Sequence, residues 1–152
     1  MLSGFPADSL GGGRPMLPNH RHGQASAGII AATHNNRLGI KGIAPNVRLL
    51  PVNFYNTGMI STVWAAQCID WAWQNGADVI SNSWGVSCSF SANVIDNAID
   101  NARTQGRGGL GAVVVFAAGN GGIGCIDFPA NLPGVMAVGA LDKFGNRTSY
   151  SS

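Results

Sequence analysis

The sequence predicts an α/β fold built on a mostly parallel sheet. Apolar runs of strand length alternate along the chain with amphipathic stretches of helical length, an order typical of right-handed βαβ units. Of the 152 residues, 45% are apolar, only 11% are charged and 22 are glycine. This composition is typical of buried strands joined by tight turns. The length is sufficient for one domain with a core of its own.

Each expected element has its own pattern. In the stretch 60–74, Ser61 is a candidate N-cap, and apolar residues recur at helical spacing, namely Ile60, Trp64, Cys68 and Trp71. A second stripe is formed by Val94, Ala98 and Ala102, with Ile95 and Ile99 beside it. The expected elements are a helix over 22–34, a strand over 46–55 that Pro51 restricts, a helix over 60–74, a buried strand over 77–85, a helix over 91–105, and strands over 111–120 and 134–142.

Charge and hydropathy exclude several classes of function. The net charge is +2 without a basic run, so we expect no nucleic-acid partner. The longest strongly apolar stretch, 111–119, is far shorter than the ~20 residues of a membrane span. No signal peptide is visible at the N-terminus. The sequence predicts no particular oligomeric state.

A glycine pattern raises the possibility of dinucleotide binding. Residues 119–124 read G-N-G-G-I-G, which matches the fingerprint G-x-G-x-x-G, and Asp142 follows at about the expected distance. The fingerprint also needs a helix directly after it. The stretch 125–134 contains two prolines and no helical stripe, so this interpretation is disfavoured.

Four blocks point instead to acyl transfer. They are H-G-Q-A-S-A-G at 22–28, S-W-G at 83–85, A-A-G-N at 117–120 and V-M-A-V-G-A at 135–140. In this order and near this spacing they resemble the subtilase family of subtilisin-like serine peptidases, although Gln24 stands where the family usually has Thr. The resemblance covers about residues 20–152. It implies a three-layer α/β fold with helices on both faces of the sheet, here incomplete.

The resemblance assigns catalytic roles to two residues. His22 would be the general base, which takes the proton of a serine hydroxyl and returns it to the leaving amine. Asn120 would donate its side-chain amide to the developing oxyanion; a turn that favours Asn is the structural alternative. We expect His20 and His34 to be ordinary hydrogen-bonded residues.

The same resemblance implies a peptide-binding site. Ser83, Trp84 and Gly85 would pair through their backbone with an extended substrate, and core packing is the alternative for Trp84. The remaining implied substrate residues are Ala118 and Gly119, which would line the pocket for a substrate side chain, and Gly58 in a second flanking segment.

Two parts of a Ser-His-Asp site are not found. No D-[ST]-G turn precedes His22, and no G-T-S-M-A block follows Asn120. We therefore expect a loop segment over 1–19 and a partial peptidase domain over 20–152 that is inactive alone. The full-length protein would be a serine endopeptidase acting on peptides or proteins. The alternative is a non-catalytic peptide-binding module.

Three further expectations concern ions, thiols and location. The mechanism requires no cofactor, but the loop 34–40 resembles a family calcium loop that would use Asn36, with a simple polar turn as the alternative. Cys88 and Cys125 each follow a predicted strand at the same sheet edge, so a disulfide and two separate thiols are both open. The resemblance implies an extracellular location.

Overall fold

The computed structural model describes residues 21–53, 61–122 and 124–152. The chain divides into two compact units, Met1–Ile60 and Ser61–Ser152. Each unit is described by itself.

The first unit contains helix α1 (His22–Ala31) and a loop that returns to its C-terminal end. The backbone N–H groups of Gly42, Ile43 and Ala44 donate to the carbonyls of Ala32, Ile29 and Ile30 at 2.8–3.0 Å. A Cβ at Gly42 would lie 2.7 Å from the Ala31 Cα, so only glycine permits this approach. The helix expected over 22–34 is confirmed, but it ends three residues early where this loop packs.

The strand expected over 46–55 is wrong for residues 46–53. These residues form no strand, and residues 54 and 55 lie outside the described part of the chain. The Val47 N–H donates to Ala44 in a turn, Val47 and Leu49 are both exposed, and Pro51 has no N–H to donate. Alternating apolar residues are insufficient here because a strand also needs a hydrogen-bonded neighbour.

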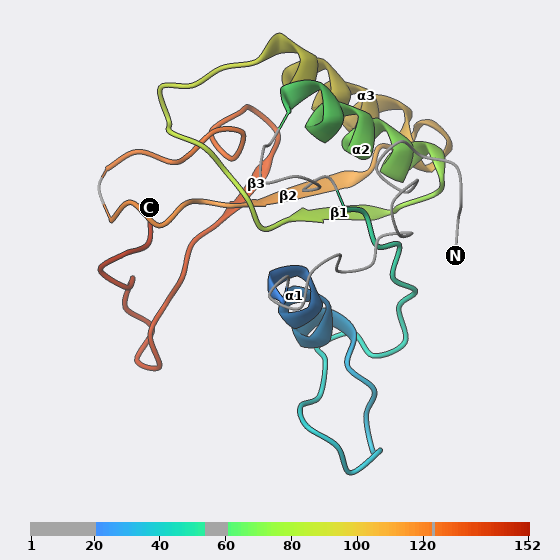
Figure 1. Cartoon of the computed structure of the whole chain (residues 1–152), viewed down its shortest axis with the longest axis vertical. Coiled ribbons are helices and arrows are strands. Elements are labelled where there is room, and N and C mark those ends of the chain that lie inside the picture. The colour runs from blue at the N-terminus through green and yellow to red at the C-terminus, as the bar shows by residue number, and fades with distance from the viewer. Residues whose placement is uncertain (1–20, 54–60, 123) are drawn as a thin grey trace. The chain divides into compact units, whose positions relative to one another are not determined.

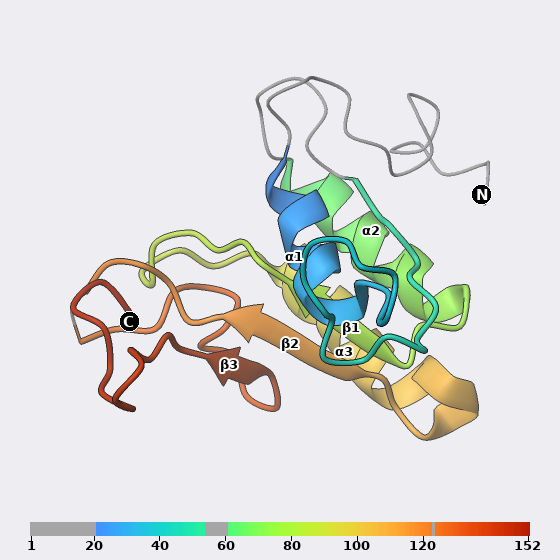
Figure 2. The same cartoon turned by 90° about the horizontal axis from the view of Figure 1, so that it is seen from below.

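The second unit is built on a parallel sheet of three strands in the order β1-β2-β3. They are β1 (Val79–Asn82), β2 (Val113–Ala117) and β3 (Met136–Val138). Asn82 pairs with Phe116, and Phe116 pairs with Ala137. Figure 2 shows β2 and β3 side by side. The predicted α/β class with a parallel sheet is confirmed.

Helices α2 (Thr62–Gln74) and α3 (Asn93–Gly109) cover one face of this sheet (Figure 1). Most of the buried residues of the two helices are small, and small side chains let packed helices approach closely. Ser61 occupies the expected N-cap position of α2, but its side chain makes no capping hydrogen bond. The core of the unit comprises Ala65, Ala66, Cys68, Ile69 and Ala72 of α2, Ile95, Ala98, Ile99 and Ala102 of α3, and Ile80, Val114 and Phe116 of the sheet.

The opposite face of the sheet is partly exposed. Val79 is 57% exposed and Val138 is 50% exposed, whereas Ile80 and Val114 are buried. Because successive strand residues point to opposite faces, the expectation of a buried strand over 77–85 holds for one face only.

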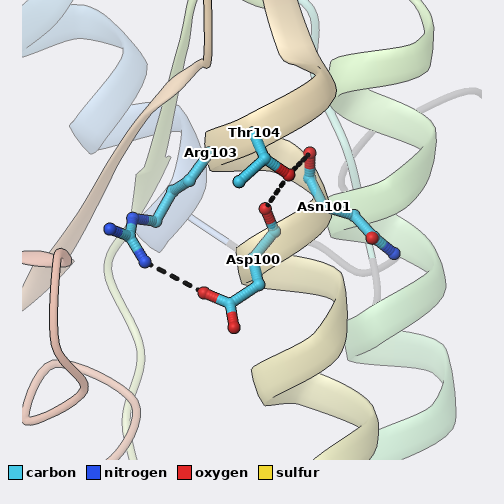
Figure 3. Close-up of polar contacts among 4 residues, drawn as sticks. All are labelled: Asp100, Asn101, Arg103 and Thr104. Carbon is cyan, nitrogen blue, oxygen red and sulfur yellow. Dashed lines mark hydrogen bonds and ion pairs between the residues drawn. The ribbon is translucent and has the colours of Figure 1, made fainter. Parts of the chain in front are cut away.

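The outer surface of α3 carries local polar contacts (Figure 3). Arg103 forms an ion pair with Asp100 at 2.9 Å. The Thr104 hydroxyl donates to the carbonyls of Asp100 and Asn101 at 2.7 and 3.5 Å. An exposed ion pair of this kind contributes about 0–1 kcal/mol to folding stability, so these surface contacts add little to the stability of the fold. Among the described residues, no helix is both long and apolar enough to cross a bilayer.

Candidate functional site

The site lies at the carboxyl edge of the sheet, where the segments after β1 and β2 emerge together. The pairing of Asn82 with Phe116 brings both strands to this edge at the same level. The Asn82 amide donates to the Val115 carbonyl at 3.2 Å, and its oxygen accepts from the Trp84 indole N–H at 3.2 Å. Asn82 thereby fixes how the chain leaves β1.

Trp84 packs on the core while its neighbours face solvent. Its ring meets Phe116 edge to face, with 5.0 Å between centroids, and its side chain is half-buried. Ser83 and Gly85 are exposed. The Trp84 side chain therefore serves core packing, which was the alternative to a role in substrate binding. Its neighbours Ser83 and Gly85 remain exposed at the surface.

A short antiparallel bridge ties the segment after β1 to the chain that leads into β3. Val86 and Phe128 exchange two backbone hydrogen bonds, 2.9 and 3.0 Å. One residue earlier, the Asp127 N–H donates to the Ala118 carbonyl at 2.8 Å. The structure also joins Cys88 and Cys125 in a disulfide, with their Cα atoms 6.1 Å apart. Asp127 is a site residue that the sequence did not indicate, because it belongs to no motif.

The loop after β2 presents Asn120. Gly119 adopts a φ of +115°, which an L-residue with a side chain rarely adopts. The Ser152 N–H donates to the Gly119 carbonyl at 3.1 Å, and the Ser152 hydroxyl accepts from the Gly121 N–H at 3.2 Å. Asn120 is exposed, and its amide has no hydrogen-bond partner among the described residues. It can therefore donate to a ligand. The role of Ser152 was not predicted.

The dinucleotide interpretation gains nothing from the structure. No helix follows the glycine pattern in the described residues 124–135. Asp142, the candidate ribose ligand, accepts the backbone N–H groups of Phe144 and Asn146 at 2.8 and 2.9 Å. These hydrogen bonds, that from Asn146 first, lower the pKa of its carboxyl. Asp142 therefore closes a turn of its own chain.

Two histidines of the first unit, His22 and His34, lie in the described part of the chain. His22 is the exposed first residue of α1, and its carbonyl accepts from the Ser26 hydroxyl at 3.2 Å. The His34 Nε2–H donates to the Gly42 carbonyl at 2.7 Å, so His34 is satisfied by its own unit, as expected. Gly58 and His20 lie outside the described residues.

The loop 34–40 contains Asn36, the residue that the resemblance associates with calcium. Its Asn36 side-chain oxygen already accepts the Leu38 N–H at 3.0 Å, and Asn35 and Arg37 have positive φ values of 60° and 61°. Calcium takes six to eight oxygen ligands, usually including carboxylates, and this loop contains no carboxylate. The described residues of the loop therefore do not fit a calcium ion by themselves.

Comparison with known proteins decides the family. The model of the "Subtilase family" matches residues 8–152. The chain belongs to the subtilase family. Four blocks in order had predicted this from the sequence, and the prediction is confirmed.

Similar proteins include curated bacterial peptidases. The alkaline protease of Alkalihalobacillus alcalophilus is 37% identical over 160 aligned positions, which cover 99% of this chain and 40% of that protein. Subtilisin Savinase of Lederbergia lenta is 36% identical over 99% of this chain and 56% of that protein. The chain thus spans 40–56% of the length of these two relatives.

Solved structures share the fold. The prenylagaramide maturation protease PagA superposes with a TM-score of 0.71 and 30% identity, covering 82% of this chain and 44% of that one. The self-cleaved protease domain of PatA gives the same TM-score with 32% identity, covering 82% and 46%. Both likenesses confirm the subtilisin-like fold.

Proposed function

We propose that this chain is part of a longer protein, called the parent protein below, which hydrolyses peptide bonds as a serine endopeptidase. The family membership and the 40–56% coverage of curated relatives support this. The parent protein would supply the serine and aspartate of the triad from outside these 152 residues. Its substrates would be peptides or proteins.

The exposed Asn120 amide is the observation that carries this proposal. It stands at the carboxyl edge of the sheet, directly after Ala118 and Gly119, and its N–H groups are uncommitted within the described residues. A donor held in place before the reaction stabilises the oxyanion of a tetrahedral intermediate without reorganisation. Gly119 and the bonds from Ser152 hold the loop that presents it.

Substrate binding would use the exposed backbone of the segment 83–85. We propose that Ser83 and Gly85 offer backbone groups to an extended peptide, which would add to this edge as a strand. The Trp84 side chain anchors this segment to the core by packing on Phe116. His22 would act as the general base, because an imidazole can accept and return a proton near neutral pH.

The test uses a serine-reactive fluorophosphonate probe and a quenched peptide substrate. The parent protein should be labelled and active, and His22→Ala should abolish both signals. His20→Ala is the matched control and should retain activity. The isolated 152-residue chain should show no labelling. A parent protein that binds peptides without labelling or cleavage would establish the non-catalytic alternative instead.

We further propose that catalysis needs no cofactor and that the parent protein acts outside the cell. A Ser-His-Asp mechanism uses side chains alone, and the Cys88–Cys125 disulfide suits an oxidising compartment. Any calcium would be a structural ion. EDTA should therefore leave the initial rate unchanged, with a metal requirement visible only as a lower melting temperature, and fractionation should recover the protein from the culture medium.

A further inference from the structure

A carboxylate lies between the two segments proposed to hold the substrate. A Cβ placed on Gly119 would be 2.6 Å from the Asp127 Cγ. A Cβ placed on Gly85 would be 3.3 Å from the Asp127 Cβ and 3.8 Å from its Oδ2. The side chain of Asp127 therefore occupies the space that two glycines, one on each segment, leave open.

The backbone fixes Asp127 in this position from both sides. Its own N–H donates to the Ala118 carbonyl at 2.8 Å, and the next residue, Phe128, is paired with Val86. Phe128 is buried, and two residues before Asp127 the disulfide holds Cys125. Because its backbone is anchored on both sides, Asp127 can move its carboxylate only by rotating its own short side chain, and the carboxylate therefore stays near Gly119 and Gly85.

The Asp127 carboxylate has no hydrogen-bond or ion-pair partner in the part of the chain that the structure describes. Within residues 21–53, 61–122 and 124–152, the ion pairs involve Asp100 and Asp78, and no hydrogen bond reaches the side-chain oxygens of Asp127. Asp127 is half-buried. Removing an unpaired charge from part of its water costs free energy, and a cation entering this space would offset that cost.

We propose that Asp127 selects substrates with a lysine or arginine side chain directly before the cleaved bond. This inference rests on the proposed function. Asn120 follows Gly119 immediately, so a substrate side chain that reaches the Asp127 carboxylate beside Gly119 would belong to the residue whose carbonyl faces the oxyanion donor. A carboxylate beside that side chain attracts an ammonium or guanidinium group and disfavours an apolar one.

The first test compares two reporter peptides that differ only in having Arg or Leu before the cleaved bond. In the parent protein, Asp127→Asn should lower kcat/KM for the Arg peptide by about 10- to 100-fold, the range of one charged hydrogen bond. It should change kcat/KM for the Leu peptide by less than about threefold. Asp100→Asn, an exposed acid on α3, is the matched control and should alter neither value.

A change in the ratio of the two kcat/KM values separates selectivity from a structural role, because misfolding lowers both together. Asp127→Lys should reverse the preference. A variant that cleaves the Leu peptide but no longer cleaves the Arg peptide would support the proposal. An unchanged Arg-to-Leu ratio in both variants would overturn it. So would a wild-type protein that prefers Leu.

A binding measurement keeps this inference separate from the proposed catalysis. Fluorescein-labelled peptides that end in Arg or Leu resemble products, and their anisotropy reports binding without turnover. Asp127-dependent preference for the Arg peptide, in a parent protein that cleaves nothing, would support Asp127 and refute the peptidase. Cleavage or binding without any dependence on Asp127 would refute this inference and leave the peptidase standing. A parent protein that neither cleaves nor binds would overturn both.

Discussion

The Asp127 N–H donates to the Ala118 carbonyl at 2.8 Å, which joins the chain entering β3 to the end of β2. Together with the Val86–Phe128 bridge, this bond makes three sequence-distant segments into one platform at the carboxyl edge of the sheet. The residues proposed to bind substrate and oxyanion stand on that platform. Its stability therefore determines whether the site keeps its geometry.

Phe128→Ala should weaken the platform strongly. Phe128 is 1% exposed and packs edge to face on Phe90 at 5.6 Å. Removing a buried phenylalanine ring leaves a cavity and costs about 3–5 kcal/mol. Urea unfolding of the parent protein measures this. Phe144→Ala is the control at a residue that is 76% exposed, and it should change stability by less than about 0.5 kcal/mol. Equal effects of the two substitutions would contradict the assigned core.

Replacing Cys88 and Cys125 by serine should destabilise the same region. The bond closes a loop with a sequence separation of 37. A loop of this size loses about 4 kcal/mol of chain entropy in the unfolded state when it is cross-linked, according to the chain-entropy model. We expect a clear fall in melting temperature for the double variant, and a similar fall for the wild-type protein in reductant.

Thiol chemistry provides the control for that prediction. Burial raises the pKa of the Cys68 thiol to about 12, so native protein at pH 8 should take up no alkylating reagent at Cys68. A non-reducing digest should contain one peptide pair linked through Cys88 and Cys125. Labelled Cys88 in unreduced protein would show that the two thiols are separate.

The sequence predicted the elements whose patterns are local. Ala98, Ala102, Ile95 and Ile99 of the predicted stripe are buried as expected, because helix periodicity decides which side chains share a face. Val94, at the start of the same stripe, is 40% exposed. The stripe of α2 was less accurate. Trp64 is 37% exposed while Ala65 and Ala66 are buried, because α2 packs against α3 and the spacing of apolar residues does not show which side of a helix its neighbour will contact.

Residues of the candidate site stand out in the sequence where they belong to a motif, and they do not stand out where their position depends on tertiary contacts. Asn120 and the segment 83–85 stand out in sequence because glycine and polar residues end apolar strands. Asp127 and Ser152 do not stand out, since their roles come from hydrogen bonds and approaches to residues distant in the chain. Asp127 follows a cysteine within a proline-containing loop, and only the fold shows that it faces Gly119 and Gly85.

Asn120→Ala in the parent protein should lower kcat without a matching change in KM. Loss of an oxyanion donor costs about 10²–10³-fold in kcat, a range known from a subtilisin. Because Asn120 is exposed and has no partner among the described residues, its removal should leave the melting temperature unchanged. Steady-state kinetics on one peptide and a thermal melt test both statements. A lower melting temperature with unchanged kcat would identify Asn120 as a turn residue only.

Asp142→Asn should change the acid stability of the second unit. Backbone hydrogen bonds from Asn146 and Phe144 lower the pKa of the Asp142 carboxyl below its usual value of about 3.9. A lowered folded-state pKa contributes stability that is present above the unfolded-state pKa and lost as the pH falls through the folded-state pKa. The wild-type protein should therefore melt at a higher temperature than the variant near pH 6, and the gap should narrow as the pH falls below about 4. Asp100→Asn is the control on the α3 surface, where no such narrowing is expected. A gap that is constant with pH would show that the charged carboxylate contributes nothing to this turn.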